Sequence, residues 1–126
     1  MSVNLDEFFD FGVKKPINRL AYSQEDIDYK IKVIKKMQEM GMTITMDKIG
    51  NICGKFEFGP NPSEKRIAIG SHTDSVYNGG QYDGSLGVAA ALMVVDKLKQ
   101  SKEDSMVHCL YVYINVKNQV DLVLLV

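Results

Sequence analysis

A glycine-rich segment in the middle of the chain carries residue types that bind metal ions. His72 and Asp74 stand two positions apart, and Asp83 follows after a short loop. A neutral imidazole binds Zn²⁺ or a similar ion through one ring nitrogen, and a carboxylate can bridge two ions with its two oxygens. On an extended backbone Asp74 points to the same side as His72, where it could hydrogen-bond the far ring nitrogen or a metal-bound water. The three side chains are therefore candidates for a metal site.

The elements around this segment predict how the three side chains meet. Residues 66–70 form a short, mostly apolar run, typical of a central strand covered on both faces, and His72 comes just after it. Open α/β sheets bind their ligands at this end of a strand. Residues 84–98 are apolar nearly all round, which predicts a buried helix directly after Asp83. Glycines in the loop let the backbone turn sharply and bring Asp83 back against His72: Gly79, Gly80 and Gly84.

A purely structural interpretation of the same residues is also open. A single His-x-Asp after a strand is a weak signal, and Asp83-Gly84 could be a turn whose aspartate caps the next helix. A turn alone, however, has no need of a histidine, two aspartates and three glycines together. The whole string favours a metal site.

The remaining pattern predicts an α/β fold in which helices pack on a sheet. A short helix is expected over residues 5–11, and Ser23 is placed to cap a longer helix that Gly41 ends. Apolar residues of that longer helix recur at helical spacing and should face the core: Ile27, Ile31, Ile34, Met37 and Met40. Strands are expected on either side of a turn and again further on, at 42–46, 52–58 and 107–116, with the turn at 47–51. Helices interleaved with strands indicate a layered α/β domain.

Length and composition indicate one globular domain. The chain has 126 residues, 45% hydrophobic and 25% charged, and a net charge of −1. Neither sign of charge clusters, so nothing suggests nucleic acid or a membrane as a partner. No secretory signal is visible at the start, so we expect a cytoplasmic protein in which Cys53 and Cys109 are reduced thiols. The second histidine, His108, lies in an alternating β segment and is expected to be structural or exposed.

The segment from Gly70 to Val88 resembles the metal-site signature of the hydantoinase/carbamoylase family, which includes N-carbamoyl-L-amino-acid hydrolases, β-ureidopropionases and allantoate amidohydrolases. The string Gly79-Gly80-Gln81-Tyr82-Asp83-Gly84 favours this branch over related deacylases and aminopeptidases, which carry a similar His-x-Asp in a different loop. Residues 18–23, 39–42 and 47–54 are similar to the family's N-terminal pattern. The resemblance therefore runs from about Pro16 to Gln100.

This resemblance implies a fold, a reaction and a cofactor. The fold is the N-terminal portion of the catalytic domain of a dinuclear-metal hydrolase. The reaction is hydrolysis of a linear amide or ureido C–N bond in a small-molecule substrate, with two divalent metal ions (Zn, Mn, Co or Ni). In this scheme His72 binds one metal, Asp83 bridges both, and Asp74 supports catalysis from outside the ligand set. The family forms homodimers through a second domain, which we expect to be absent from this chain.

The end of the chain departs from the family pattern. A glutamate general base and an adjacent glutamate ligand belong directly after the strand at 107–116, where this chain has Asn115-Val116-Lys117-Asn118-Gln119. The later histidines and the substrate-binding asparagine and arginine are expected beyond its end, so this chain would carry only part of the metal site. The strand at 107–116 should then be an interior strand whose neighbours belong to the missing chain.

These departures lead to three expectations about the chain as it stands. Within a domain portion spanning 1–126, residues 117–126 should be an aberrant tail that arose from a reading-frame change. The chain alone should be inactive, and its β-prone, nearly uncharged tail should make it unstable or prone to aggregate. The alternative, from another class of function, is a non-catalytic remnant or an interaction module.

Overall fold

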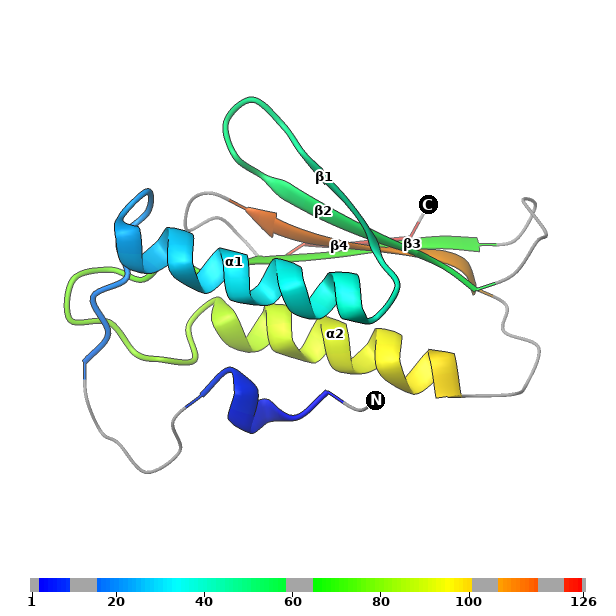
Figure 1. Ribbon diagram of the computed structural model, residues 1–126, viewed down its shortest axis with the longest axis horizontal. Helices are drawn as coiled ribbons and strands as arrows, with labels where there is room; N and C mark the ends of the chain where they lie inside the picture. The colour runs from blue at the N-terminus through cyan, green and yellow to red at the C-terminus, as the bar shows by residue number, and fades with distance from the viewer. Residues whose placement is uncertain (1–2, 10–15, 59–64, 101–106, 116–121, 126) are drawn as a thin grey trace.

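A five-stranded sheet with two long helices forms the computed structural model of the protein (Figure 1). The structure describes residues 3–9, 16–58, 65–100, 107–115 and 122–125. The strands run in the order β1-β2-β4-β3-β5 across the sheet. Their bounds are β1 Thr43–Met46, β2 Ile52–Glu57, β3 Lys65–His72, β4 Val107–Asn115 and β5 Leu122–Leu125. The helices are α1 Gln24–Glu39 and α2 Ser85–Gln100, and they confirm the predicted α/β class.

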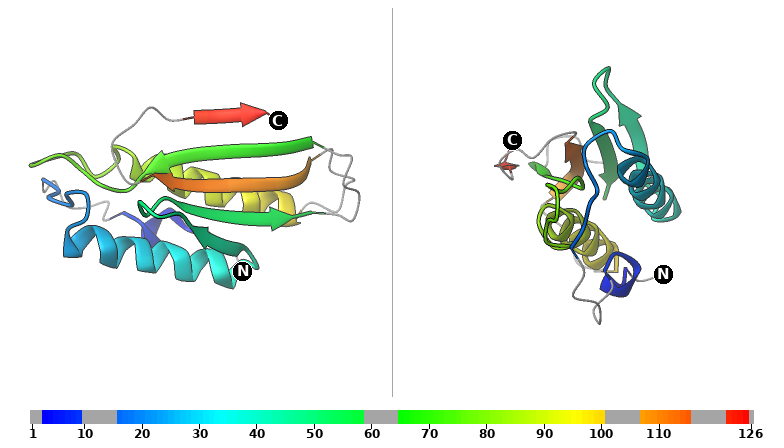
Figure 2. Two further views of the ribbon diagram at one scale, coloured as in Figure 1. Left: turned by 90° about the horizontal axis from the view of Figure 1, so that it is seen from above. Right: turned by 90° about the vertical axis from the view of Figure 1, so that its left-hand side faces the viewer.

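Strand pairing brings the ends of two parallel strands to one edge of the sheet. β3 and β4 are parallel, and His72 at the end of β3 is level with Asn115 at the end of β4. β2 runs antiparallel to β4, and β5 runs antiparallel to β3 (Figure 2). The prediction that β4 is interior is confirmed, but the prediction that its neighbours belong to missing chain is wrong. This chain supplies both neighbours: β2, which pairs antiparallel with β4, and β3, which is connected to β4 through α2.

The two helices lie on the same face of the sheet (Figure 1), so the expected covering of the central strand on both faces is wrong for the part of the chain described. The face toward the helices holds the fully buried side chains of β4: Leu110, Val112 and Ile114. At Gly54 on β2, a Cβ would lie 3.0 Å from the sulfur of Met37, which shows how closely α1 approaches this face. The opposite face carries Tyr111 and the partly exposed Tyr113.

Helix α1 begins and ends as predicted, but its inward face differs. The hydroxyl of Ser23 accepts a hydrogen bond from the backbone N–H of Asp26, and Gly41 follows the helix with a φ of +87°. Ile27 and Ile31 were expected to face the core and are exposed. In the first part of the helix the buried stripe is displaced by one residue, to Asp26, Lys30 and Val33, whereas Met37 and Met40 are buried as predicted. With Lys36, three charged side chains of α1 are buried. Tertiary contacts of Asp26, described below, override the apolar periodicity.

Helix α2 confirms the predicted helix but not its burial on all sides. Val88, Leu92 and Val95 are buried against the sheet. Leu86, Met93 and Val94 are about two-fifths exposed on the other side, contrary to the expectation. No helix within the described ranges is both long enough and apolar enough to cross a membrane.

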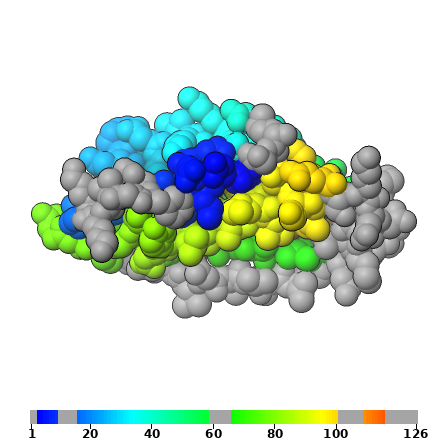
Figure 3. All heavy atoms as spheres, turned by 90° about the horizontal axis from the view of Figure 1, so that it is seen from below, coloured from blue at the N-terminus to red at the C-terminus, as the bar shows by residue number. Residues whose placement is uncertain are grey.

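The N-terminal segment crosses the outer surface of both helices (Figure 3). The backbone N–H of Val3 donates to the carboxylate of Asp96 on α2 (3.0 Å), and Lys36 on α1 forms an ion pair with Glu7 (2.9 Å). The predicted helix over residues 5–11 is instead a 3-10 turn, η1 Leu5–Glu7, closed by a capping box with Asn4. Residues 10 and 11 lie outside the described part of the chain.

The hairpin predicted around residues 47–51 is confirmed. β1 pairs antiparallel with β2, and one carboxylate oxygen of Asp47 accepts hydrogen bonds from the backbone N–H groups of Ile49 and Asn51. Cys53 and Cys109 are free thiols, as expected.

Candidate metal centre

The structure brings the three predicted site residues together at the end of β3. His72 Nδ1 lies 2.9 Å from the backbone oxygen of Asp74, and His72 Nε2 lies 3.9 Å from Oδ1 of Asp83. A carbonyl oxygen can only accept a hydrogen bond, so the ring proton belongs on Nδ1. The lone pair of Nε2 is therefore left for a ligand on the side of Asp83. The expected proximity of His72 and Asp83 is confirmed.

Asp74 holds the imidazole differently from the expectation. The closer contact to Nδ1 comes from its backbone oxygen, whereas its carboxylate Oδ1 lies at 3.3 Å. That carboxylate is almost fully buried, and Oδ1 has no hydrogen-bond partner. A buried carboxylate oxygen without a partner beside an imidazole is a polar group that a positive charge would satisfy.

The separation of His72 and Asp83 is close to what one metal ion requires. Zinc binds nitrogen at about 2.0–2.1 Å and oxygen at about 2.0–2.2 Å, so two ligand atoms of a tetrahedral ion stand about 3.3–3.5 Å apart. The observed 3.9 Å is slightly longer, and the Asp83 side chain is 59% exposed, so a rotation can shorten it. The pair therefore fits a divalent ion. Over the described ranges, however, no group of three or more potential metal ligands is found, whereas catalytic zinc typically keeps three.

Gly84 allows the backbone after Asp83 to pass directly against His72. Its φ is +77°, a left-handed conformation that side chains rarely adopt. A Cβ at this position would lie within 3.0 Å of two ring atoms and the carbonyl oxygen of His72. The hydroxyl of Ser71 donates to the Gly84 carbonyl at 2.8 Å and fixes the approach. Of the three loop glycines, only Gly84 has a positive φ, so Gly79 and Gly80 do not use the left-handed conformation that favours glycine.

A clamp formed by residues 17–19 holds the other side of the loop, and no sequence pattern predicted it. Ile17 and Gly79 exchange two backbone hydrogen bonds of 2.8 Å. The Ser75 N–H donates to the Arg19 carbonyl (2.6 Å), and the Ser75 hydroxyl accepts from the Arg19 N–H (2.9 Å). The residues that follow His72 and Asp74 are therefore paired with a segment far upstream.

A buried carboxylate on α1 supports the loop from below. Asp26 is fully buried; its Oδ1 accepts a hydrogen bond from the Thr73 hydroxyl (2.9 Å), and its Oδ2 pairs with Lys30 (2.8 Å). Thr73 lies between His72 and Asp74 and is itself fully buried. The available signal was the Asp-to-Lys spacing of four residues, which places opposite charges on one helical face.

Arg19 joins the two pieces of the loop. Its Nε donates to the Thr73 carbonyl and its Nη2 to the Ser85 hydroxyl, both at 2.7 Å. The guanidinium carbon lies 3.9 Å from the ring centre of Tyr29, a cation–π contact. Burial lowers the pKa of Arg19 and raises that of Tyr29 from their ordinary values. A delocalised guanidinium keeps its charge under such burial.

The end of β4 lies next to the predicted site. Asn115 is level with His72 in the pairing of β3 with β4. His108 lies seven positions earlier on the same strand, about 23 Å away at roughly 3.3 Å per residue. Its position agrees with the expectation that it is not a ligand of this site.

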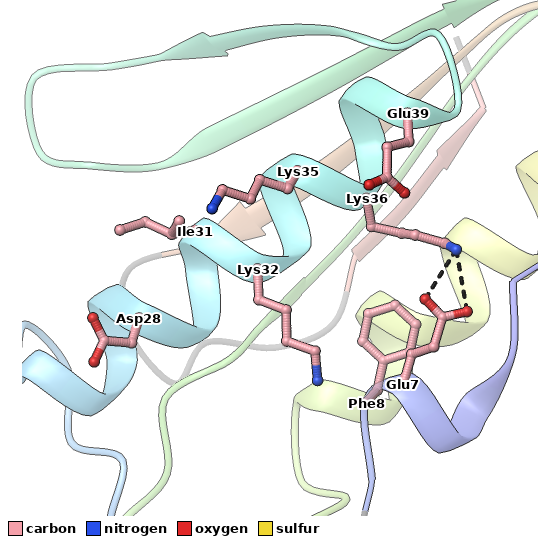
Figure 4. A pocket seen from close by; sticks show the side chains of 8 residues that line it. All are labelled: Glu7, Phe8, Asp28, Ile31, Lys32, Lys35, Lys36 and Glu39. Atoms are coloured by element: carbon pink, nitrogen blue, oxygen red, sulfur yellow. Dashed lines mark hydrogen bonds and ion pairs between the residues drawn. The ribbon is translucent and has the colours of Figure 1, made fainter.

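Two hollows among the described residues lie away from the predicted site residues. One lies between η1 and α1 and balances three lysines with three carboxylates, so it has no charge preference (Figure 4). Its lining residues are Glu7, Phe8, Asp28, Ile31, Lys32, Lys35, Lys36 and Glu39. The other lies on the sheet face opposite the helices and reaches Asn115 at its edge. In this hollow the rings of Tyr111 and Tyr113 stack on each other, with their centroids 6.4 Å apart.

Comparison with known proteins agrees with the α/β fold and with the family resemblance. No family model matches the chain. An N-carbamoyl-L-amino-acid amidohydrolase from Pseudomonas sp. is 37% identical over 103 residues, which are 80% of this chain and 25% of that protein. The allantoate amidohydrolase of Bacillus subtilis is 38% identical over 85 residues, 68% of this chain and 20% of that one. A crystal structure of a hydantoinase/carbamoylase family amidase from Burkholderia vietnamiensis matches with a TM-score of 0.72 and 28% identity, covering 80% of this chain and 24% of that chain.

The chain has an α/β fold, and over most of its length it is similar to amidohydrolases. In sequence and in fold, the chain belongs to the hydantoinase/carbamoylase family. It spans about a quarter or less of the length of the relatives that it matches.

Proposed function

We propose that this chain is part of a metal-dependent amidohydrolase that cleaves a linear amide or ureido C–N bond. The observation that carries the proposal is the Nε2 lone pair of His72, which faces Asp83 3.9 Å away at the carboxyl end of a central strand. The names of the relatives point to N-carbamoyl-L-amino acids or allantoate as the substrate class. Both are small molecules that contain a ureido group.

In this proposal each of the three site residues has its own role in binding metal. His72 would bind a divalent ion through Nε2, while the Asp74 carbonyl keeps the proton on Nδ1. Asp83 would bridge that ion to a second one, and its exposed carboxylate has both oxygens available for this. The Asp74 carboxylate, buried beside the imidazole, would strengthen the ligand by raising the basicity of its metal-binding nitrogen. Bound metal ions would supply polarisation of the scissile carbonyl and a water of lowered pKa.

The same proposal predicts that the purified chain is inactive. The described residues offer two ligands and no general base, and removal of general acid–base catalysis alone costs about 10²–10⁴-fold in rate. The chain, loaded with Zn²⁺ or Mn²⁺, should therefore hydrolyse neither an N-carbamoyl-L-amino acid nor allantoate above background. Turnover that His72→Ala abolishes would contradict this prediction.

Metal binding tests the site independently of activity. A Zn²⁺ titration followed by NMR of the imidazole signals should show weak binding at His72. Both His72→Ala and Asp83→Asn should abolish or weaken it, whereas His108→Gln should leave it unchanged. A His72 ring that does not respond to Zn²⁺ would overturn the proposal and favour a non-catalytic module.

A further inference from the structure

We infer that Arg19 is a positioning residue that sets the separation of His72 and Asp83. The inference rests on the proposed function, because it concerns the two proposed metal ligands. The two ligands lie 3.9 Å apart at the two ends of a loop, and these ends must be held together to keep that separation. The Arg19 guanidinium is the one charged group of the described residues that hydrogen-bonds to both ends.

The two hydrogen bonds of Arg19 fall on the residues that matter most for this separation. Nε donates to the carbonyl of Thr73, the residue between His72 and Asp74. Nη2 donates to the hydroxyl of Ser85, the first residue of α2, two positions after Asp83. A planar guanidinium fixes the angle and the distance between its donors. This rigid group, together with the hydrogen bond from Ser71 to the Gly84 carbonyl, therefore determines the distance from the His72 turn to the start of α2.

The surroundings keep this group in place. Tyr29 lies against the guanidinium at 3.9 Å, and the Arg19 backbone is itself paired with Ser75 on the loop. Thr73 and Ser85 are 0% and 1% exposed, so water cannot replace a lost donor at either acceptor. Asp26 and Asp74 face the guanidinium and balance its charge.

A lysine at position 19 would keep the charge but not the function. Its ammonium is a single point on a flexible stem, so it cannot hold two acceptors at a fixed separation. Arg19→Lys should therefore leave the fold in place and let Asp83 drift relative to His72. Ser85→Ala removes one end of the bridge without changing any charge, and it serves as the second variant.

The experiment is a Zn²⁺ titration of the 126-residue chain, with the ¹⁵N shifts of the His72 ring as the readout. Arg19→Lys and Ser85→Ala should each weaken zinc binding about 10- to 100-fold, the usual effect of removing a group that orients a ligand. The ring proton should remain on Nδ1 in both variants, because the Asp74 carbonyl still accepts it. The matched control is Arg66→Lys, an exposed arginine on β3, which should bind zinc as the parent chain does.

A double-mutant cycle separates positioning from general stability. With Asp83→Asn already present, there is no second ligand to misplace, so Arg19→Lys should then weaken zinc binding by less than about threefold. Parent-like zinc affinity in Arg19→Lys and Ser85→Ala would overturn the inference, and so would a full loss that persists in the Asp83→Asn background. If the parent chain itself binds no zinc at His72, the proposed function is wrong, and the inference is lost with it.

Discussion

Replacing Gly84 with alanine should disrupt the His72 site and destabilise the fold. An alanine at φ +77° costs about 1–2 kcal/mol relative to glycine. The new methyl group would also lie within 3.0 Å of the His72 ring and its carbonyl oxygen. The ring is only 3% exposed and is held by the Asp74 carbonyl, so it has no free space to move into. Overpacking of this kind costs about 1–3 kcal/mol, which brings the expected loss to about 2–5 kcal/mol.

The measurement is denaturant unfolding followed by circular dichroism, with Gly80→Ala as the matched control. Gly80 belongs to the same loop, but nothing lies within 4 Å of its would-be Cβ and its φ is not positive. Its substitution should change the free energy of unfolding by less than about 0.5 kcal/mol. Domains of this kind are stable by only about 5–15 kcal/mol, so the Gly84 variant should have a far lower midpoint. Equal midpoints for the two variants would show that Gly84 does not pack against His72 as described.

Three further predictions follow from the buried and charged groups. Asp26→Ala removes the acceptor of Thr73 and leaves the charge of Lys30 buried, so it should cost about 3–5 kcal/mol in denaturant unfolding; the exposed neighbour Asp28→Ala should cost less than about 0.5 kcal/mol. The hydrogen bond from Lys36 lowers the pKa of Glu7 below its ordinary 4.5, so the ion pair stabilises the fold fully above pH 4.5, and this stability is lost as the pH falls through the lowered pKa. Because the pair is partly exposed, Glu7→Gln should remove less than about 1 kcal/mol of acid-sensitive stability. An acid-unfolding curve that this variant leaves unchanged would contradict the pairing. Burial raises the pKa of the Cys53 thiol above 9.0, so iodoacetamide at pH 8 should modify it more slowly in the folded chain than after unfolding, and equal rates would refute this.

The parts of the fold that are visible in the sequence are those with local causes. Ser23 and Gly41 mark the ends of α1 through capping and a left-handed backbone, and the Asp47 turn specifies the first hairpin. His72 and Asp83 could be paired in advance because a strand end and a helix start, joined by a short loop, bring them to one edge. Each of these signals lies within a few residues of the feature that it predicts.

The parts that the sequence did not predict depend on contacts between distant segments. The buried face of α1 could not be read from its isoleucines, because the hydrogen bond between Asp26 and Thr73 determines which side turns inward. The neighbours of β4 follow from how the sheet is completed, which no local pattern reports. Arg19 was only one residue of a family-like string, and its role emerges when Thr73 and Ser85 are brought together in space.

The clamp around the site also has a consequence for how the chain folds. Arg19 contacts partners that are 54, 56 and 66 residues away along the chain, so each hydrogen bond closes a large loop. Closing such loops is entropically costly, and contacts between residues this far apart in the sequence slow folding. The hairpin of β1 and β2 can form early from neighbouring residues, whereas the site around His72 should be assembled among the last steps. An ion that binds only the assembled site would then stabilise the folded state, by about 1.4 kcal/mol for each tenfold excess over its dissociation constant.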